Sequence, residues 1–187
     1  EGKITIDGED IRNVTQHELR DQLGYVPQKG VLFSGTIASN ILYGNPDGSE
    51  ETMMEAAKVA QAAEFIEEKP KCYDSRISQG GGNVSGGQKQ RLSIARAIAK
   101  DPKIFIFDDS FSALDYKTDV TLRKALKEHT VNSTVIIVAQ RISTILHADQ
   151  IIVLDEGKVA GIGTHKELLK NSDVYYQIAA AQLSENE

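Results

Sequence analysis

The sequence contains no tryptophan, and Cys72 is the one cysteine among 187 residues. A single cysteine excludes a disulfide within the chain and suits a reducing compartment. The apolar runs, such as those at 135–138 and 151–154, are far shorter than the ~20 residues that a membrane-spanning helix needs. Acidic residues outnumber basic ones by 27 to 21. No excess of positive charge therefore favours binding to nucleic acid or to an anionic membrane surface.

The size and composition of the chain fit a single domain. With 40% hydrophobic and 26% charged residues, it has the composition of an ordinary globular protein. A chain of this length buries roughly 70% of the surface that it exposes when unfolded. The sequence starts at Glu1 without Met and shows no signal peptide. We expect from this abrupt start that the domain is N-terminally truncated.

Apolar patterns predict strands that alternate with helices. The runs at 104–107, 134–138 and 150–154 have the length and character of buried strands, and helical patterns such as 117–128 separate them. This alternation is typical of parallel βαβ units. Short strands are also expected at 3–7 and 23–26, and a tight hairpin turn at 155–158.

The middle of the chain is predicted to be mainly helical. Between Gly35 and about Ala99, apolar residues recur at helical spacing, and acidic residues gather near the start of the pattern at 50–63. We therefore expect one α/β domain with an inserted helical subdomain. Its parts would be a first core region (1–33), the helical subdomain (about 34–99) and a second core region (about 100–187).

A short polar motif precedes the helical pattern that ends at Ala99, and it consists of Ser85, Gly86, Gly87 and Gln88. A helix N-terminus with accessible glycine amides binds phosphate, because its N–H groups and the helix dipole both favour an anion. A helix N-cap without a ligand uses the same residue types. The motif thus predicts a phosphate site, a helix cap or both.

The apolar strand at 104–107 ends in two carboxylates, Asp108 and Asp109. An aspartate at such a strand end commonly holds Mg²⁺ beside a bound nucleotide. A solvent-exposed acidic strand end is the alternative. In combination with a phosphate-binding helix, the pattern indicates a nucleoside triphosphatase.

These motifs resemble the nucleotide-binding domain of an ABC transporter of the exporter type. The resemblance also rests on Gln28, which follows the strand at 23–26, and on Ser112–Asp115, which precedes a helix. It covers essentially the whole chain. It implies a P-loop NTPase (RecA-like) fold with a mainly parallel sheet, and ATP and Mg²⁺ as cofactors.

The resemblance also implies roles for individual residues. Gln28 would be the Q-loop glutamine, whose amide oxygen reaches Mg²⁺ or the attacking water, although a polar residue in a turn is an alternative for it. Asp108 would hold Mg²⁺ through water. Residues 85–88 would be the signature that contacts ATP held by a second domain, and Asp115 of the D-loop would reach the partner's nucleotide. A local helix cap by Asp115 is compatible with that role.

Two candidate catalytic residues depart from the family pattern. Asp109 stands where the family has a glutamate that polarises the attacking water, and retracting a carboxylate by ~1 Å can cost about 10²-fold in rate. Gln140 stands where the family has its switch histidine, and an amide can donate to a phosphate but cannot transfer a proton. With the signature nearly intact, this combination resembles one half of a heterodimeric exporter whose own ATP site hydrolyses slowly.

The phosphate-binding loop of the family is missing. No Gly-x-x-x-x-Gly-Lys-Ser/Thr motif occurs, because neither Lys3 nor Lys158, each of which follows a glycine, precedes a hydroxyl residue. We therefore expect that the chain alone does not bind ATP tightly.

We therefore interpret the sequence as the ATPase domain of an exporter. Its expected partners are a second nucleotide-binding domain and a transmembrane domain fused upstream, with no nucleic acid, at the cytoplasmic face of the cell membrane. A homodimeric exporter with slow hydrolysis and a non-catalytic regulatory or relic fragment stay open as alternatives. A soluble ATPase of the chromosome-maintenance or translation-factor type would show a long heptad stretch or a basic linker, and the sequence has neither.

Overall fold

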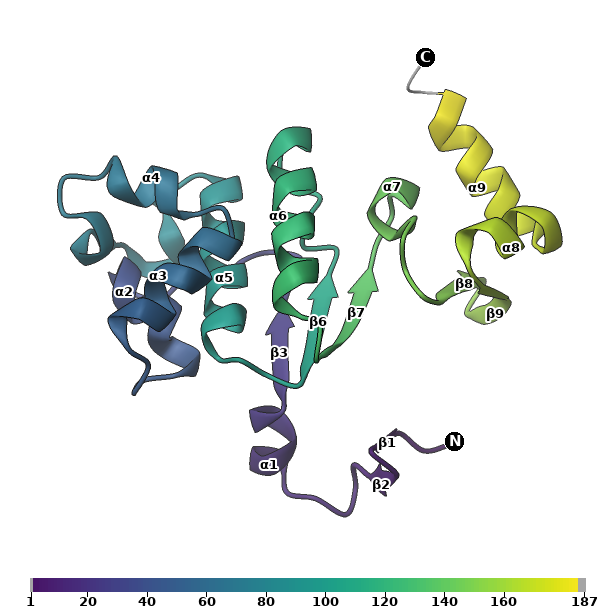
Figure 1. Ribbon diagram of the computed structural model, residues 1–187, viewed down its shortest axis with the longest axis horizontal. Helices are drawn as coiled ribbons and strands as arrows, with labels where there is room; N and C mark the ends of the chain where they lie inside the picture. Colours follow the sequence, from purple (N-terminus) through teal and green to yellow (C-terminus); the bar gives the residue numbers. More distant parts are fainter. Residues whose placement is uncertain (1, 185–187) are drawn as a thin grey trace. The chain divides into compact units, whose positions relative to one another are not determined.

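The computed structural model describes residues 2–184 and divides the chain into two compact units, Glu1–Val138 and Ala139–Glu187. The first unit holds a three-stranded parallel sheet and most of the helices, and the second holds a hairpin and three helices (Figure 1). In the described part of the chain, no helix combines the length and the apolar character needed to cross a membrane.

The sheet of the first unit contains β3 (Leu23–Val26), β6 (Ile104–Asp108) and β7 (Thr134–Val138) in the order β3-β6-β7. Both pairings are parallel, and Phe107 lies opposite Val26 on one side and Ile137 on the other. Phe105 and Phe107 point into the core because alternate residues of a strand face the same side. The predicted parallel sheet is confirmed.

The predicted helical region is also confirmed, although a two-residue antiparallel pair, β4 with β5, interrupts it. Its longest helix, α5, is capped by Ser85 and buries Leu92, Ala95 and Ile98 against the core. The elements of this region are β4 (Gly35–Thr36), α2 (Ile37–Ile41), η1 (Leu42–Gly44), α3 (Glu50–Val59), α4 (Ala63–Glu67), η2 (Cys72–Asp74), β5 (Arg76–Ile77), η3 (Gln79–Gly81) and α5 (Gly86–Ala99).

Helix α6 (Tyr116–His129) connects β6 to β7. It contributes Leu122 and Leu126 to the same hydrophobic core as Phe105 and Phe107 of the sheet. The chain begins with a small antiparallel pair, β1 (Thr5–Ile6) and β2 (Glu9–Asp10), and then α1 (Gln16–Asp21), whose first turn is closed by a capping box of Thr15.

The second unit contains α7 (Ile142–Ile145), β8 (Ile151–Asp155), β9 (Lys158–Gly163), α8 (His165–Asn171) and α9 (Asp173–Ser184). Strand β8 pairs antiparallel with β9, so the prediction that 150–154 continues the parallel βαβ pattern is wrong. The predicted hairpin turn is confirmed, since Glu156 and Gly157 both have positive φ, 46° and 76°. A two-residue turn of this kind returns the chain directly into an antiparallel partner.

Candidate functional site

The carboxyl ends of β3 and β6 bring three of the predicted site residues together. Because the two strands are parallel and Val26 lies opposite Phe107, the residues that follow each strand meet at one edge of the sheet. There the Gln28 amide donates a hydrogen bond from Nε2 to Oδ2 of Asp109 at 3.1 Å. Asp108 precedes Asp109 at the end of β6. The site thus combines two carboxylates and one amide.

Asp109 has an unusual backbone conformation. Its φ is 45°, in the left-handed region that few residues other than glycine adopt, although aspartate tolerates it better than most. Its N–H donates to the carbonyl oxygen of Val138 at 2.9 Å. Residues held in such conformations often occur at functional sites, where the surrounding structure compensates the strain. The left-handed turn therefore agrees with a functional position for this carboxylate.

Tyr25 also belongs to this edge of the sheet, and the sequence did not identify it. Its hydroxyl donates to Oδ2 of Asp108 at 3.1 Å. This hydrogen bond, followed by desolvation and the nearby negative charge, raises the pKa of the Tyr25 hydroxyl above its ordinary value. The signal in the sequence was weak, because only the parallel register of β3 and β6 brings Tyr25 and Asp108, 83 residues apart, within reach.

A buried glutamine, Gln90 of α5, fixes the loop that carries Gln28. Its Nε2 donates to the carbonyl of Pro27 at 3.1 Å, and its Oε1 accepts from the N–H of Gly30 at 2.9 Å. Gln90 is only 2% exposed. A side-chain amide used in this way satisfies one donor and one acceptor of the loop, as a neighbouring strand would. The Gln28 loop is therefore fastened to the helix that begins after Ser85.

The predicted phosphate-binding motif begins α5 and forms a capping box. The N–H of Gln88 donates to Oγ of Ser85 at 3.2 Å, and the N–H of Ser85 donates to Oε1 of Gln88 at 3.1 Å. A Cβ added at Gly86 would meet no atom within 4 Å, whereas one at Gly87 would lie 3.4 Å from the carbonyl oxygen of Ala113. The start of the helix is thus open at Gly86 and close to the Ser112–Asp115 segment at Gly87.

Asp115 caps α6, as one of the two predicted roles requires. Its Oδ1 accepts a hydrogen bond from the N–H of Thr118 at 3.0 Å. This bond is the largest of the effects that hold the pKa of the Asp115 carboxyl below its ordinary value, and the positive charge of Arg91 contributes to the same direction. The cap places the Ser112–Asp115 segment directly before a 14-residue helix.

Gln140 lies in the second unit, between the end of β7 and the start of α7, and it is exposed. Its carbonyl oxygen accepts a hydrogen bond from Nε2 of Gln182 at 2.7 Å. Oε1 of the same Gln182 side chain accepts from the N–H of Ile142 at 2.8 Å. The backbone on both sides of Arg141 is therefore held by a residue of α9.

The oxygen donors at the sheet edge suit a hard divalent cation. Among residues 2–184, no three His, Cys, Asp or Glu side chains gather into a complete metal site. Asp108, Asp109 and the Gln28 amide are nevertheless the donor types that Mg²⁺ accepts, and this ion usually takes its other ligands from water and phosphate. The residues present therefore fit a magnesium ion that arrives with a nucleotide.

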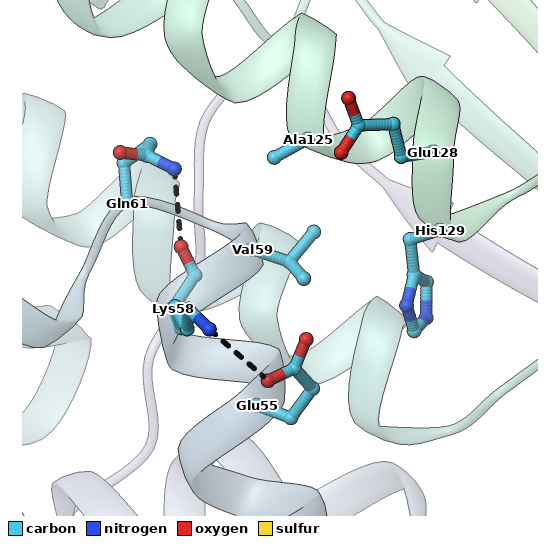
Figure 2. A pocket seen from close by; sticks show the side chains of 7 residues that line it. All are labelled: Glu55, Lys58, Val59, Gln61, Ala125, Glu128 and His129. Atoms are coloured by element: carbon cyan, nitrogen blue, oxygen red, sulfur yellow. Dashed lines mark hydrogen bonds and ion pairs between the residues drawn. The ribbon is translucent and has the colours of Figure 1, made fainter.

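A separate pocket of about 360 Å³ lies between α3 and α6 (Figure 2). The ion pair between Lys58 Nζ and Glu55 Oε2, 4.0 Å apart, forms one wall, and Gln61 donates to the carbonyl of Lys58 at 3.1 Å. Glu128 and His129 of α6 line the other side. None of the predicted site residues lines this pocket. Its position therefore gives it no part in the chemistry of the sheet edge.

Comparison with known proteins identifies the family. The model of the family described as "ABC transporter" matches residues 1–112. The uncharacterised ABC transporter ATP-binding protein YknU of Bacillus subtilis is 49% identical over 177 residues, which are 95% of this chain and 30% of that protein. The ATP-dependent lipid A-core flippase of Desulfotalea psychrophila is 46% identical over 175 residues, 94% of this chain and 31% of the flippase.

A solved structure agrees with these likenesses. The structure of a bacterial Atm1-family ABC exporter with ATP bound superposes with a TM-score of 0.95 at 43% identity and covers 98% of this chain and 32% of the exporter chain. The chain thus spans about a third of the length of the relatives that it matches. It belongs to the ABC transporter family, as a nucleotide-binding domain of the exporter type.

Proposed function

We propose that residues 1–187 are part of one ATPase domain that powers export by an ABC transporter. The observation that carries this proposal is the hydrogen bond between Gln28 and Asp109, next to Asp108, at the carboxyl ends of two parallel strands. Oxygen atoms that can bind Mg²⁺ and a carboxylate that can act as the base meet there, and hydrolysis of a nucleotide's terminal phosphate needs both. The partners would be a second nucleotide-binding domain and a transmembrane domain, at the cytoplasmic face of the membrane.

We assign the roles at this site as follows. Asp108 would hold Mg²⁺ through water, and Tyr25 would orient the Asp108 carboxylate through its hydroxyl. When bound, Mg²⁺ neutralises charge on the phosphates of the nucleotide. Asp109 would polarise the attacking water, with Gln28 orienting the Asp109 carboxylate by its amide. Gln140 would donate to the terminal phosphate but could not carry a proton.

The proposed site hydrolyses ATP slowly. The Asp109 carboxylate is one methylene shorter than a glutamate carboxylate, and displacement of a reacting group by ~1 Å can cost about 10²-fold in rate. The uncharged amide of Gln140 also gives less stabilisation to the charge that develops on the phosphate. In the full transporter, this site would therefore retain bound ATP for a long time before hydrolysing it.

The start of α5 would serve a different nucleotide, the one held by the partner domain. Ser85, Gly86, Gly87 and Gln88 present the N-terminal amides of a 14-residue helix, and the approach to Gly86 is open. Such a helix start stabilises a phosphate by its N–H groups and its dipole. Asp115, at the start of α6, would lie at the same interface. A heterodimer would then contain one competent site and one slow site.

An exposed aromatic patch supports a transmembrane partner. Val31, Phe33 and Tyr43 are 53%, 38% and 60% exposed, and the rings of Phe33 and Tyr43 lie 4.4 Å apart. Exposed apolar groups that gather in one place commonly mark a contact with another protein segment. We assign this patch to the cytoplasmic loops of the transmembrane domain.

The test uses the full transporter, purified and reconstituted in lipid vesicles, and measures ATP turnover. The double substitution Asp109→Glu and Gln140→His should raise turnover by restoring a base and a proton carrier. Unchanged turnover would contradict the slow-site assignment. The single substitution Asp109→Asn separates the two kinds of dimer, since it should abolish all turnover in a homodimer and spare most of it in a heterodimer. A parent protein without any ATP turnover would favour the non-catalytic alternative.

A further inference from the structure

The second unit contains an amide bridge that the roles assigned above do not use. Gln182 of α9 donates from Nε2 to the carbonyl of Gln140 and accepts at Oε1 from the N–H of Ile142, at 2.7 and 2.8 Å. A side-chain amide offers a donor and an acceptor side by side, as a peptide group does. The two bonds therefore fix the backbone on each side of Arg141 in the way that an adjacent strand would.

The helix that carries Gln182 is itself firmly placed within this unit. Tyr175 of α9 is buried with Ile151, Val153 and Leu168, and Ile142 and Ile145 of α7 pack against this cluster. The Tyr175 hydroxyl also lies 2.8 Å from Nδ1 of His165. Because α7 and α9 share one hydrophobic cluster, Gln182 approaches the Gln140 segment from a fixed support. The helix can thus hold the loop in one place.

We propose that Gln182 is a positioning residue that sets the place of Gln140 and thereby the retention of ATP. The proposal rests on the function assigned above, in which the Gln140 side chain donates to the terminal phosphate. A hydrogen-bond donor such as the Gln140 amide contributes to binding only when the backbone holds it within reach of the acceptor. Ordering a loose loop when the ligand binds costs free energy and so weakens binding. Loosening the loop should therefore weaken the contact with the terminal phosphate while leaving the remainder of the nucleotide site intact.

Three variants of the full transporter separate this role from general destabilisation. Gln182→Ala removes both hydrogen bonds. Gln182→Glu keeps the shape and the acceptor but removes the donor, so that an oxygen faces the Gln140 carbonyl. Gln177→Ala is the matched control, because it makes the same substitution at an exposed position of the same helix.

The first measurement is hydrogen exchange of the segment 139–146 without nucleotide. Loss of the two hydrogen bonds should accelerate exchange at Ile142 roughly thirtyfold in Gln182→Ala. Gln182→Glu should accelerate it less, because it keeps the acceptor of the Ile142 N–H and loses only the donor to Gln140, and Gln177→Ala should not accelerate it. Exchange in Gln182→Ala that equals the parent's would overturn the proposal. This result does not depend on nucleotide binding, so it stands whether or not the proposed function holds.

The second measurement compares the release of radiolabelled ATP and ADP from the same variants. Gln182→Ala should accelerate the slow phase of ATP release about tenfold and leave ADP release unchanged, because ADP lacks the terminal phosphate. In a Gln140→Ala background the substitution should have no further effect, since residues that act through one contact are not additive. Equal acceleration of ATP and ADP release, or full additivity, would overturn the positioning role.

The parent protein separates failure of the inference from failure of the proposed function. If the parent fails to retain ATP longer than ADP, the assignment of Gln140 to the terminal phosphate is wrong. If the parent retains ATP and Gln182→Ala behaves as Gln177→Ala does, the assignment of Gln182 is wrong and that of Gln140 stands.

Discussion

Arg96 of α5 offers the sharpest test of what holds the exposed aromatic patch in place. Its guanidinium donates to the carbonyl of Asn40 at 2.8 Å, to Oδ1 of the same residue at 2.8 Å and to the carbonyl of Val31 at 2.9 Å. It also lies over the ring of Phe33 at 5.0 Å and that of Tyr43 at 5.6 Å. Burial lowers the pKa of the guanidinium, so the charge is desolvated and depends on these contacts. We predict that Arg96→Met is severely destabilising.

The expected loss follows from these contacts. A hydrogen bond to a charged group contributes about 1.5–3 kcal/mol. Counting only the two bonds to Asn40, at the lower value because the acceptors are neutral, gives about 3 kcal/mol. The contacts with the two rings add about 0.5–1 kcal/mol. A total of about 4 kcal/mol is a large part of the 5–15 kcal/mol that typically stabilises a domain, and it corresponds to a fall in Tm of ~10 °C for a domain of this size.

The assay is thermal unfolding of the purified transporter by scanning calorimetry, at one scan rate for all variants because such unfolding is often irreversible. Arg96→Lys should recover only part of the loss, since an ammonium group cannot reach three acceptors in the fork geometry of a guanidinium. Arg20→Met is the control, because Arg20 is an exposed residue of α1. A fall in Tm of less than about 2 °C for Arg96→Met would refute the reasoning.

Three further predictions concern buried charge, acid stability and nucleotide binding. Arg123→Met should lower the free energy of unfolding by about 3–5 kcal/mol, because it leaves the buried Asp119 carboxylate without its cation. The Asp119 side chain is 5% exposed, and its Oδ1 lies 2.9 Å from Nε of Arg123. Adding Asp119→Asn should recover most of the loss in the same calorimetric assay. The hydrogen bonds from the backbone and hydroxyl of Thr164 hold the pKa of the Glu167 carboxyl below its ordinary value of about 4.5. These bonds therefore stabilise α8 fully at a pH above 4.5, and this stabilisation is lost as the pH falls through the lowered pKa of Glu167. Protection of the backbone amides of residues 164–171 against hydrogen exchange, corrected for the intrinsic rate, should therefore fall in acid in the parent protein. In Glu167→Gln, which keeps the capping box but has no carboxyl group to protonate, the protection should stay constant. The same pH dependence in both proteins would contradict this prediction. The isolated 187-residue chain should not bind ATP at micromolar concentration by calorimetric titration, because its sequence has no Gly-x-x-x-x-Gly-Lys-Ser/Thr loop.

Local features of the fold followed from the sequence wherever neighbouring residues determine them. Strands 23–26 and 134–138 agree with the structure to the residue, and Ser85 and Asp115 cap their helices as their residue types predict. The strand at 150–154 was placed in the wrong sheet because an apolar run does not reveal the direction of its partner. Here the two-residue turn at Glu156 and Gly157 was the stronger signal, since it permits only an antiparallel return.

The candidate site was predictable only in part, for the same reason. Gln28 and Asp109 could be expected to meet, because the resemblance assigns both to hydrolysis at one ATP site, and the parallel pairing of β3 with β6 is what brings them together. The contacts of Tyr25, Gln90 and Gln182 with the site could not be expected. Each joins positions between 40 and 83 residues apart. The Tyr25 contact depends on the register of β3 and β6, and the contacts of Gln90 and Gln182 depend on which helix packs against which loop. No local pattern in the sequence contains that information.

The two hydrogen bonds of the Gln90 side chain link the start of α5, which is proposed to contact the partner's nucleotide, to the loop that carries Gln28. Gln90 lies five residues after Ser85 on the same helix, a rise of about 7.5 Å along the helix axis. It is buried and bonded to Pro27 and Gly30, on either side of Gln28. A displacement of α5 that leaves these two bonds intact must carry the Gln28 loop with it, and breaking them would leave buried polar groups unpaired at a cost of about 1–3 kcal/mol each. Contact of a phosphate with the start of α5 and the position of Gln28 beside Asp109 are therefore not independent.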